Sequence, residues 1–296
     1  YVEPLGTSQL TIDTFDEEQV YEVDEYSVAK AGRKWYGDRF DVENERSYEF
    51  TFKNLVTSTP VKVIGNVIAA SESSTTMNIS LNGQNLTDLN FGTISDDIYG
   101  ARSVINEELT VSGDEITLEL VYNNSGNPSS LAYLDYLRVQ AKRSLTADNS
   151  QMAFTYKDAA TTGGIGQYVI QNTGNISQIW DVTHQNNIKS ISNAQNSTSL
   201  SFKASMGEIR KYVAISPNDY YTPLKETNPK VENINLKGNV FKDGQGNFQD
   251  VDYLIVTNED LLNQASRLAQ FRRDRDGLAV KVVLVNDIYT EFNSGK

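Results

Sequence analysis

The fold of this chain is decided by its last 45 residues, which open with Asp252-Tyr-Leu-Ile-Val-Thr-Asn-Glu-Asp260 and close with Tyr289-Thr-Glu-Phe-Asn-Ser-Gly-Lys296. Residues 253–257 form a short apolar run, as expected of a parallel strand that is covered on both faces. Asn258 then provides a helix N-cap, and the acids that follow it suit the positive end of the helix dipole. The stretch therefore predicts a strand that leads directly into a helix.

A second strand and the start of a second helix complete the pattern. Apolar side chains recur at helical spacing on one face, at Leu261, Leu262, Ala265, Leu268 and Ala269. Arginines fill the last turns, and Gly277 supplies the stop. Residues 279–285 read as the next strand, and Asn286 or Asp287 should cap the helix that follows. Two strands joined by one helix should pair in parallel with a right-handed crossover, so residues 251–296 predict a βαβ unit.

The preceding residues are rich in β-strand patterns. Residues 30–143 hold about seven or eight short strands separated by turn signals, which predicts an antiparallel β-sandwich of jelly-roll type. Asn82-Gly83 is its strongest turn signal, because both residues tolerate a positive φ. Residues 144–217 predict a smaller second β segment. Residues 218–250, with several prolines and glycines, predict an extended connector into the α/β unit.

Residues 1–29 are predicted to form an acidic N-terminal segment. Between Asp13 and Glu25 there are seven acids and no base, interleaved with apolar side chains. Such a run is most often a solvated linker or an edge strand. The alternative is a docking strand for a basic partner.

Four segments of the C-terminal unit carry a resemblance to a known family, among them Ala265-Ser-Arg-Leu-Ala-Gln-Phe-Arg-Arg273 and Gly277-Leu-Ala-Val-Lys-Val-Val283. Together with residues 253–257 and 287–295 they resemble the opening of the gingipain-type cysteine peptidase domain, which has a caspase-like α/β fold. Residues 32–40, 122–128 and 133–137 are similar to one branch of that family, the cell-surface sortases of the bacterial type IX secretion system. Asn258 departs from the pattern, because many relatives carry His after the first strand.

The resemblance implies an enzyme that removes C-terminal sorting domains from secreted cargo proteins and attaches the cargo to anionic surface lipopolysaccharide. It also implies a place at the cell surface, associated with the outer membrane, and an outer-membrane β-barrel shuttle protein as partner. The Cys nucleophile and His base of the family are expected beyond residue 296. The chain has no Cys and a single His, His184, which we interpret as a surface or turn residue. No catalytic residue is therefore expected among these 296 residues, and the chain alone is predicted to be inactive.

Composition excludes one class of partner and indicates no cofactor. The net charge of −13 argues against nucleic acid, because binding phosphates requires a basic surface. No apolar run approaches the roughly 20 residues that a membrane-spanning helix needs. Calcium is possible, but the loop at Asp243 breaks off too early for an EF-hand, and no specific residues indicate a metal site.

Four residues follow the ends of the two predicted parallel strands, namely Thr257, Asn258, Asn286 and Asp287. Active sites of open α/β sheets gather at the carboxyl ends of strands, so these residues are candidates for the rim of a substrate cleft. Helix capping explains Asn258 and Asp287 without any substrate.

Two other functions remain open. The sandwich could be a carbohydrate-binding module that stacks sugars on aromatic side chains, with Trp35, Tyr36, Tyr99, Tyr122 and Tyr133 as candidates. Aromatic side chains at strand spacing more often fill a core. The chain could also be an interaction scaffold with a catalytically dead α/β unit.

Overall fold

The structure, a computed structural model, describes residues 3–4, 6–28, 34–95, 99–148, 150–225, 227 and 233–293. The chain divides into two compact units, an N-terminal unit of residues 1–221 and a C-terminal unit of residues 222–296. The predicted domain boundary at residues 29 and 30 lies outside the described residues, as do the last three residues of the predicted βαβ unit.

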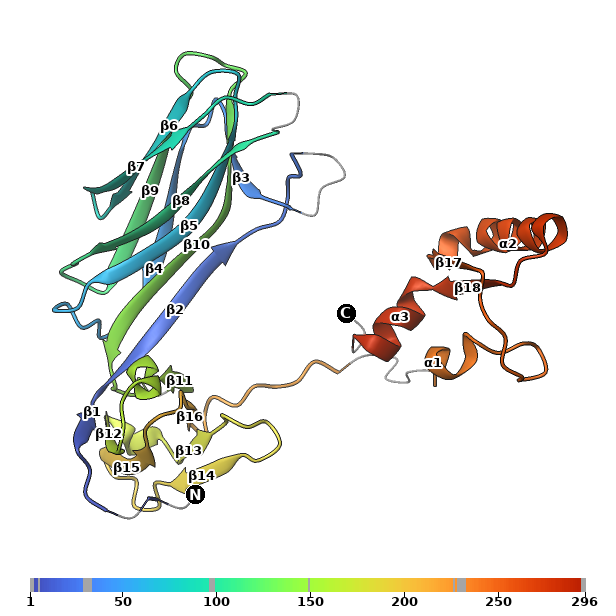
Figure 1. Cartoon of the computed structure of the whole chain (residues 1–296). Helices are drawn as coiled ribbons and strands as arrows, with labels where there is room; N and C mark the ends of the chain where they lie inside the picture. The colour runs from blue at the N-terminus through green and yellow to red at the C-terminus, as the bar shows by residue number, and fades with distance from the viewer. Residues whose placement is uncertain are drawn as a thin grey trace. The chain divides into compact units, whose positions relative to one another are not determined.

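Two antiparallel sheets form a sandwich in the N-terminal unit (Figure 1). The first has the order β2-β10-β5-β8, with β3 also paired to β10. Its strands are β2 (Thr14–Glu22), β3 (Gly37–Phe40), β5 (Val61–Ala70), β8 (Ala101–Leu109) and β10 (Leu131–Ser144). The second has the order β4-β9-β6-β7, with β4 (Glu45–Thr51), β6 (Thr75–Leu81), β7 (Gln84–Phe91) and β9 (Glu115–Asn123). The predicted antiparallel β-sandwich is confirmed.

Alternation of side chains along the strands builds the sandwich core. On β6, Met77, Ile79 and Leu81 are completely buried, and the residues between them face outward. The neighbouring strand β9 alternates in the same way. Asn82 and Gly83 connect β6 to β7 with φ angles of 48° and 75°, as expected of a two-residue hairpin loop.

The second β segment packs two smaller sheets around a cluster of aromatic rings. Their orders are β1-β12-β15, with β1 parallel to β12, and β11-β16-β13-β14. The strands are β1 (Leu10–Ile12), β11 (Met152–Thr155), β12 (Ile165–Gln171), β13 (Gln178–Asp181), β14 (Lys189–Ser192), β15 (Ser199–Ser205) and β16 (Lys211–Ile215), and the 3₁₀ helices are η1 (Lys157–Ala160) and η2 (Thr173–Asn175). Tyr168 stacks on Phe202 with ring centroids 5.0 Å apart, and Phe154 stacks on Tyr212 at 5.2 Å. These rings are among the bulkiest side chains of a small core.

Two parts of the chain run from the sandwich into the second β segment. β1 continues through Asp13 into β2, and β10 continues into Leu145, whose N–H donates to the Asp13 carbonyl at 2.7 Å. Phe15 of β2 is 1% exposed and belongs to the core of the second segment. The guanidinium of Arg143 lies 5.0 Å from the Phe15 ring. The sandwich and the second segment therefore share packed side chains at their junction.

The acidic residues of the N-terminal segment lie largely in β2, a strand of the sandwich. β2 pairs in antiparallel fashion with β10 along its whole length, and of the two expected forms it is an edge strand. Its acids face the basic side chains of β10: Asp16 lies 3.4 Å from Lys142, and Glu18 lies 3.5 Å from Arg138. The basic partners of this acidic strand thus belong to the same chain, more than 100 residues further along the sequence.

The C-terminal unit contains the predicted parallel strand pair, β17 (Tyr253–Thr257) and β18 (Val280–Leu284). Between them lie η3 (Glu259–Leu261) and α2 (Leu262–Asp276), and α3 (Val285–Phe292) follows. Gly277 ends α2 with a φ of 66°, and its N–H donates to the Arg273 carbonyl at 3.1 Å. The βαβ prediction is confirmed, with β18 one residue shorter at each end than expected.

The predicted connector, residues 218–250, is only partly extended. Residues 217–225 are all exposed, but a short helix, α1 (Leu236–Asn239), contacts α3. The carboxylate of Glu291 in α3 accepts hydrogen bonds from the backbone N–H groups of Leu236 and Lys237. Residues from Leu236 onward therefore belong to the C-terminal unit.

The exposed part of the connector should be the first site of proteolysis. Tyr220 and Tyr221 are 63% and 84% exposed, whereas most other aromatic side chains of the N-terminal unit are buried in its cores. We expect brief chymotrypsin treatment of the folded chain to cut at these two residues first and to release two fragments that mass spectrometry can identify. Early cleavage within the sandwich strands would contradict this assignment of the connector.

Strand β17 is more exposed than a parallel strand usually is. Leu254 and Val256 are 49% and 50% exposed, although the sequence predicts a strand covered on both faces. α2 packs mainly on β18, and the described residues leave about half of the surface of these two side chains uncovered. Apolar strand residues of this kind are normally buried beneath further strands or helices of a larger sheet.

Candidate functional site

The carboxyl ends of β17 and β18 lie side by side, because Thr257 and Leu284 are register partners in the parallel pair. The sheet therefore brings two of the four candidate residues, Thr257 and Asn258, to the same edge as the start of α3, which contains Asn286 and Asp287. This is the edge at which ligands bind in open α/β sheets.

Asn258 acts as a helix cap. Its side-chain oxygen accepts a hydrogen bond from the N–H of Leu261 at 3.0 Å, and its φ and ψ of −87° and 170° are those of an N-cap residue. Thr257 has a weaker role, because its hydroxyl donates to the Asn258 carbonyl at 3.3 Å. Both contacts organise the turn between strand and helix.

The expected cap of the second helix is wrong. α3 begins at Val285, its N-cap position is Leu284, and no side chain caps it. Asn286 and Asp287 consequently lie inside the first turn. There the Asp287 carboxylate is placed where the helix dipole favours a negative charge. Among the described residues its side chain has no hydrogen-bond or ion-pair partner.

Removal of the Asn258 cap should weaken the start of α2. We expect Asn258→Ala to cost about 1 kcal/mol of stability, measured as earlier loss of helical circular dichroism in urea. Asn258→Asp is the matched control, because an aspartate accepts the same N–H. In a catalytically complete enzyme, lost peptidase specificity at unchanged melting temperature in Asn258→Ala would contradict a pure capping role.

His184 lies in an exposed bend of the N-terminal unit. Its imidazole is 60% exposed, and Nε2 lies 3.5 Å from the Glu208 carboxylate. The chain contains no thiol that could use this histidine as a base. The arrangement is that of a surface contact.

The loop at Asp243 is closed by its own hydrogen bonds. One Asp243 carboxylate oxygen accepts from the N–H groups of Gln245 and Asn247, each at 2.9 Å. These bonds lower the pKa of Asp243. The carboxylate therefore stabilises a turn. Among the described residues no cluster of three His, Cys, Asp or Glu side chains has a metal-binding arrangement.

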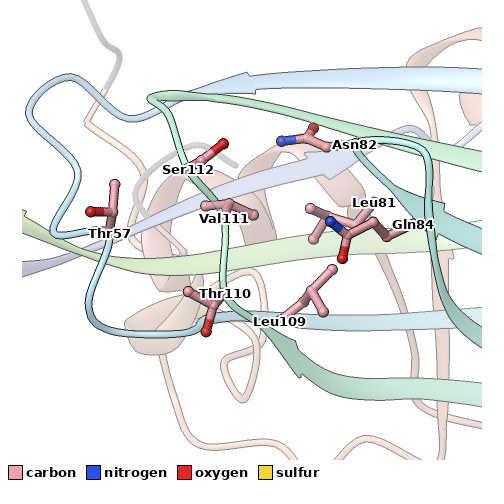
Figure 2. Close-up of a pocket in the computed structure, with 8 residues that line it drawn as sticks. All are labelled: Thr57, Leu81, Asn82, Gln84, Leu109, Thr110, Val111 and Ser112. Atoms are coloured by element: carbon pink, nitrogen blue, oxygen red, sulfur yellow. The ribbon is translucent and has the colours of Figure 1, made fainter.

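A hollow of about 410 Å³ lies at one end of the sandwich (Figure 2). Its polar lining consists of hydroxyl and amide side chains, Thr57, Thr110, Ser112, Asn82 and Gln84. Asn82 is already engaged, because its side chain donates to the Glu115 carbonyl and accepts from the Thr117 N–H. The residues that line it include hydroxyls but no titratable group, so the hollow offers no general base to activate a nucleophile.

The proposed aromatic platforms are divided between core and surface. Tyr36 and Tyr122 are 5% and 0% exposed and belong to buried regions, whereas Trp35 and Tyr99 are 49% and 65% exposed. The ring of Tyr133 packs beside Tyr36 at 6.3 Å. Only two of the five candidate rings are therefore largely free to meet a sugar.

One cluster of titratable side chains was not predicted from the sequence. The Asp38 carboxylate on β3 accepts hydrogen bonds from the hydroxyls of Tyr21 on β2 and Tyr48 on β4, at 2.6 and 2.9 Å. Burial, with the hydrogen bond to Asp38, raises the pKa of Tyr21 to about 12 and raises the pKa of Tyr48 even further. The two rings lie 4.8 Å apart. The cluster joins both sheets at one edge of the sandwich.

The sequence model of peptidase family C25 matches residues 247–296. This match covers the connector end, the strand pair and the candidate edge described above. Residues 247–296 are similar to peptidase family C25. C25 is a class of cysteine peptidases, so the gingipain-type resemblance is confirmed for this part of the chain.

Among solved structures, dimeric latent PorU from Porphyromonas gingivalis matches the whole chain at 23% identity with a TM-score of 0.74. The chain spans 28% of the length of that PorU chain, and the likeness shows a shared fold. A carbohydrate-binding module of family CBM36, from a xylanase of the hindgut metagenome of Trinervitermes trinervoides, matches 42% of this chain and 96% of its own at 16% identity. Its TM-score of 0.28 is too low to bear on fold or function. No curated protein matched the chain in a sequence search.

None of the helices in the described residues is long and apolar enough to cross a bilayer.

Proposed function

We propose that this chain is the N-terminal part of a PorU-like cell-surface cysteine peptidase and sortase. The observation that carries the proposal is the C25 match at residues 247–296, which begins a peptidase domain directly after β-sheets that share the PorU fold. By resemblance, the enzyme removes the C-terminal sorting domain of secreted cargo and attaches the cargo to anionic lipopolysaccharide.

The half-exposed side chains of β17 support this proposal. Leu254 and Val256 would be covered by the further strands of a complete peptidase domain. The catalytic His and Cys would then come from residues beyond 296, at the same carboxyl edge as Thr257 and Asp287. Within this chain, Asn258 would hold the first strand-to-helix turn of that edge in place.

The proposed reaction is acyl transfer in two steps. A cysteine thiolate attacks the carbonyl carbon of the bond before the sorting domain, the C–N bond breaks, and the histidine gives a proton to the leaving amine. The cargo is then held as a thioester. An amine of the acceptor attacks that carbonyl and gives a proton to the histidine, the C–S bond breaks, and the thiolate is regenerated. With water in place of the amine, the same steps give simple hydrolysis.

The test uses the full-length enzyme, a cargo protein that retains its C-terminal sorting domain, and purified anionic lipopolysaccharide. We expect the cargo to lose the domain and gain a lipopolysaccharide-linked carboxyl end, which mass spectrometry detects, and we expect iodoacetamide to abolish both products. The 296-residue chain, which has no thiol, is the inactive control. Cleavage that resists iodoacetamide would refute the cysteine mechanism. Cleavage without a linked product would refute the sortase role, and no reaction at all would favour a non-catalytic scaffold.

A further inference from the structure

β2 has an open side along which another strand could pair. Within the described residues it pairs with β10 only and so forms the end of its sheet. The unpaired side of such a strand presents backbone N–H and C=O groups that a second extended chain can bind. At the opposite side of the sandwich, β7 and β8 contact each other and close the gap between the sheets.

Two hollows follow one another along this open side. The first, of about 290 Å³, is lined by Asp16, Glu17 and Glu18 together with residues of β11 and β16. The second, of about 390 Å³, is lined by Gln19, Val20 and Tyr21 together with residues of β4. Six consecutive residues of β2, about 20 Å of extended chain, therefore border the two neighbouring hollows. We refer to the two hollows together as the β2 trough.

Side-chain contacts hold β4 beside β2 without joining the two strands into one sheet. The ring of Tyr21 packs 4.8 Å from that of Tyr48, and the Gln19 amide donates to the Thr51 carbonyl at 2.8 Å. No backbone pairing links β2 to β4 among the described residues. The trough is thus kept open by fixed side chains, so an incoming strand would find its site preformed.

The charge of the lining selects the kind of segment that fits. Four carboxylates line the two hollows, those of Asp16, Glu17, Glu18 and Glu49, against a single ammonium from Lys211. The acids of β2 are balanced by bases of β10, but Glu49 on β4 is exposed and has no ion-pair partner among the described residues. Val20, 49% exposed, supplies an apolar surface between these charges.

We propose that the β2 trough binds an extended peptide segment with basic side chains at alternate positions, which adds to the sheet as a strand beside β2. Backbone hydrogen bonds would supply affinity, and the carboxylates would select lysine or arginine. A second copy of this chain is a poorer occupant, because two acidic β2 edges would repel each other. The proposal concerns a binding surface and does not depend on peptidase activity.

The test measures binding of synthetic six-residue peptides to the 296-residue chain by fluorescence anisotropy. We expect the alternating Lys-Val peptide to bind, and the alternating Glu-Val peptide and a Lys-Pro peptide of equal charge not to bind, since proline cannot donate to a strand. Hydrogen exchange should slow for amides of residues 16–21 on binding and remain unchanged in β8. Added salt should weaken the complex.

Two variants with the same change in charge locate the site. Glu49→Lys should weaken binding of the Lys-Val peptide about tenfold, because it places a cation in the trough. Glu107→Lys, on the exposed edge strand β8 of the same sheet, should leave binding unchanged. Equal binding of the Lys-Pro peptide, equal effects of the two variants, protection of β8 instead of β2, or dimerisation of the chain through β2 would each overturn the proposal.

Discussion

Replacement of Arg143 by Met should destabilise the N-terminal unit by about 2–4 kcal/mol, since it removes one member of a mostly buried ion pair. Arg143 is 9% exposed, its guanidinium pairs with the Glu17 carboxylate, and its Nε donates to the Lys53 carbonyl at 2.5 Å. Met preserves much of the packing of the aliphatic stem, so the loss comes mainly from the charge. The measurement is urea unfolding followed by far-ultraviolet circular dichroism.

Arg138→Met is the matched control for this prediction. Arg138 lies on the same strand and faces Glu18 at 3.5 Å, but its side chain is 41% exposed. An exposed pair of this kind is worth about 1 kcal/mol or less. Adding Glu17→Gln to Arg143→Met should restore part of the loss, because no unpaired charge then remains at the junction. Equal costs for the two arginine variants would show that the Arg143 pair does not hold the junction.

The parts of the fold that the sequence predicts well are local. The strand at residues 253–257, the Asn258 cap and the Gly277 stop are separated by few residues, and each is decided by its own backbone chemistry. The hairpin at Asn82-Gly83 is of the same kind. Such features can be predicted from the sequence because the interactions that fix them lie within one turn of chain.

The features that the sequence does not predict depend on distant residues. The acidic run at residues 13–25 gives no sign that its partners lie on β10, since Glu17 and Arg143 are 126 residues apart. Asp38 likewise stands in no motif, and only the approach of three strands brings it to Tyr21 and Tyr48. Charge and polarity patterns show that such residues need partners, but they do not name them.

At the carboxyl edge of the sheet, the candidate site contains one residue whose capping role the sequence predicts and one whose role it does not predict. Asn258 caps as predicted because the chain makes a turn between β17 and η3. Asp287 does not, because β18 runs straight into α3 and leaves the N-cap position to Leu284, which has no side-chain acceptor. Where a strand passes into a helix without a loop, a capping residue cannot be located from residue type alone.

The second large effect is expected at alkaline pH and comes from the Asp38 cluster. Tyr21 has a folded pKa of about 12 against an ordinary value of 10, and the pKa of the buried Tyr48 is raised further. A raised folded pKa means that the folded state holds the proton more tightly. The stability that this contributes is fully present below pH 10 and is lost as the pH rises through about 12. Unfolding free energy should therefore fall steeply between these values.

The variant Tyr48→Phe isolates the contribution of one phenol. One pKa unit corresponds to about 1.4 kcal/mol, so wild type should lose roughly 2–3 kcal/mol more than Tyr48→Phe between pH 10 and 12. Tyr220→Phe is the control, because Tyr220 is 63% exposed on the connector and should leave the pH dependence unchanged. At neutral pH, Tyr48→Phe should cost about 1 kcal/mol, since Asp38 keeps the hydrogen bond from Tyr21.

Parallel pH profiles for wild type and Tyr48→Phe would show that the Asp38 cluster does not cause the loss of stability at alkaline pH. The steep fall in unfolding free energy would then come from the other buried tyrosines, such as Tyr36 and Tyr122, whose pKa values burial also raises.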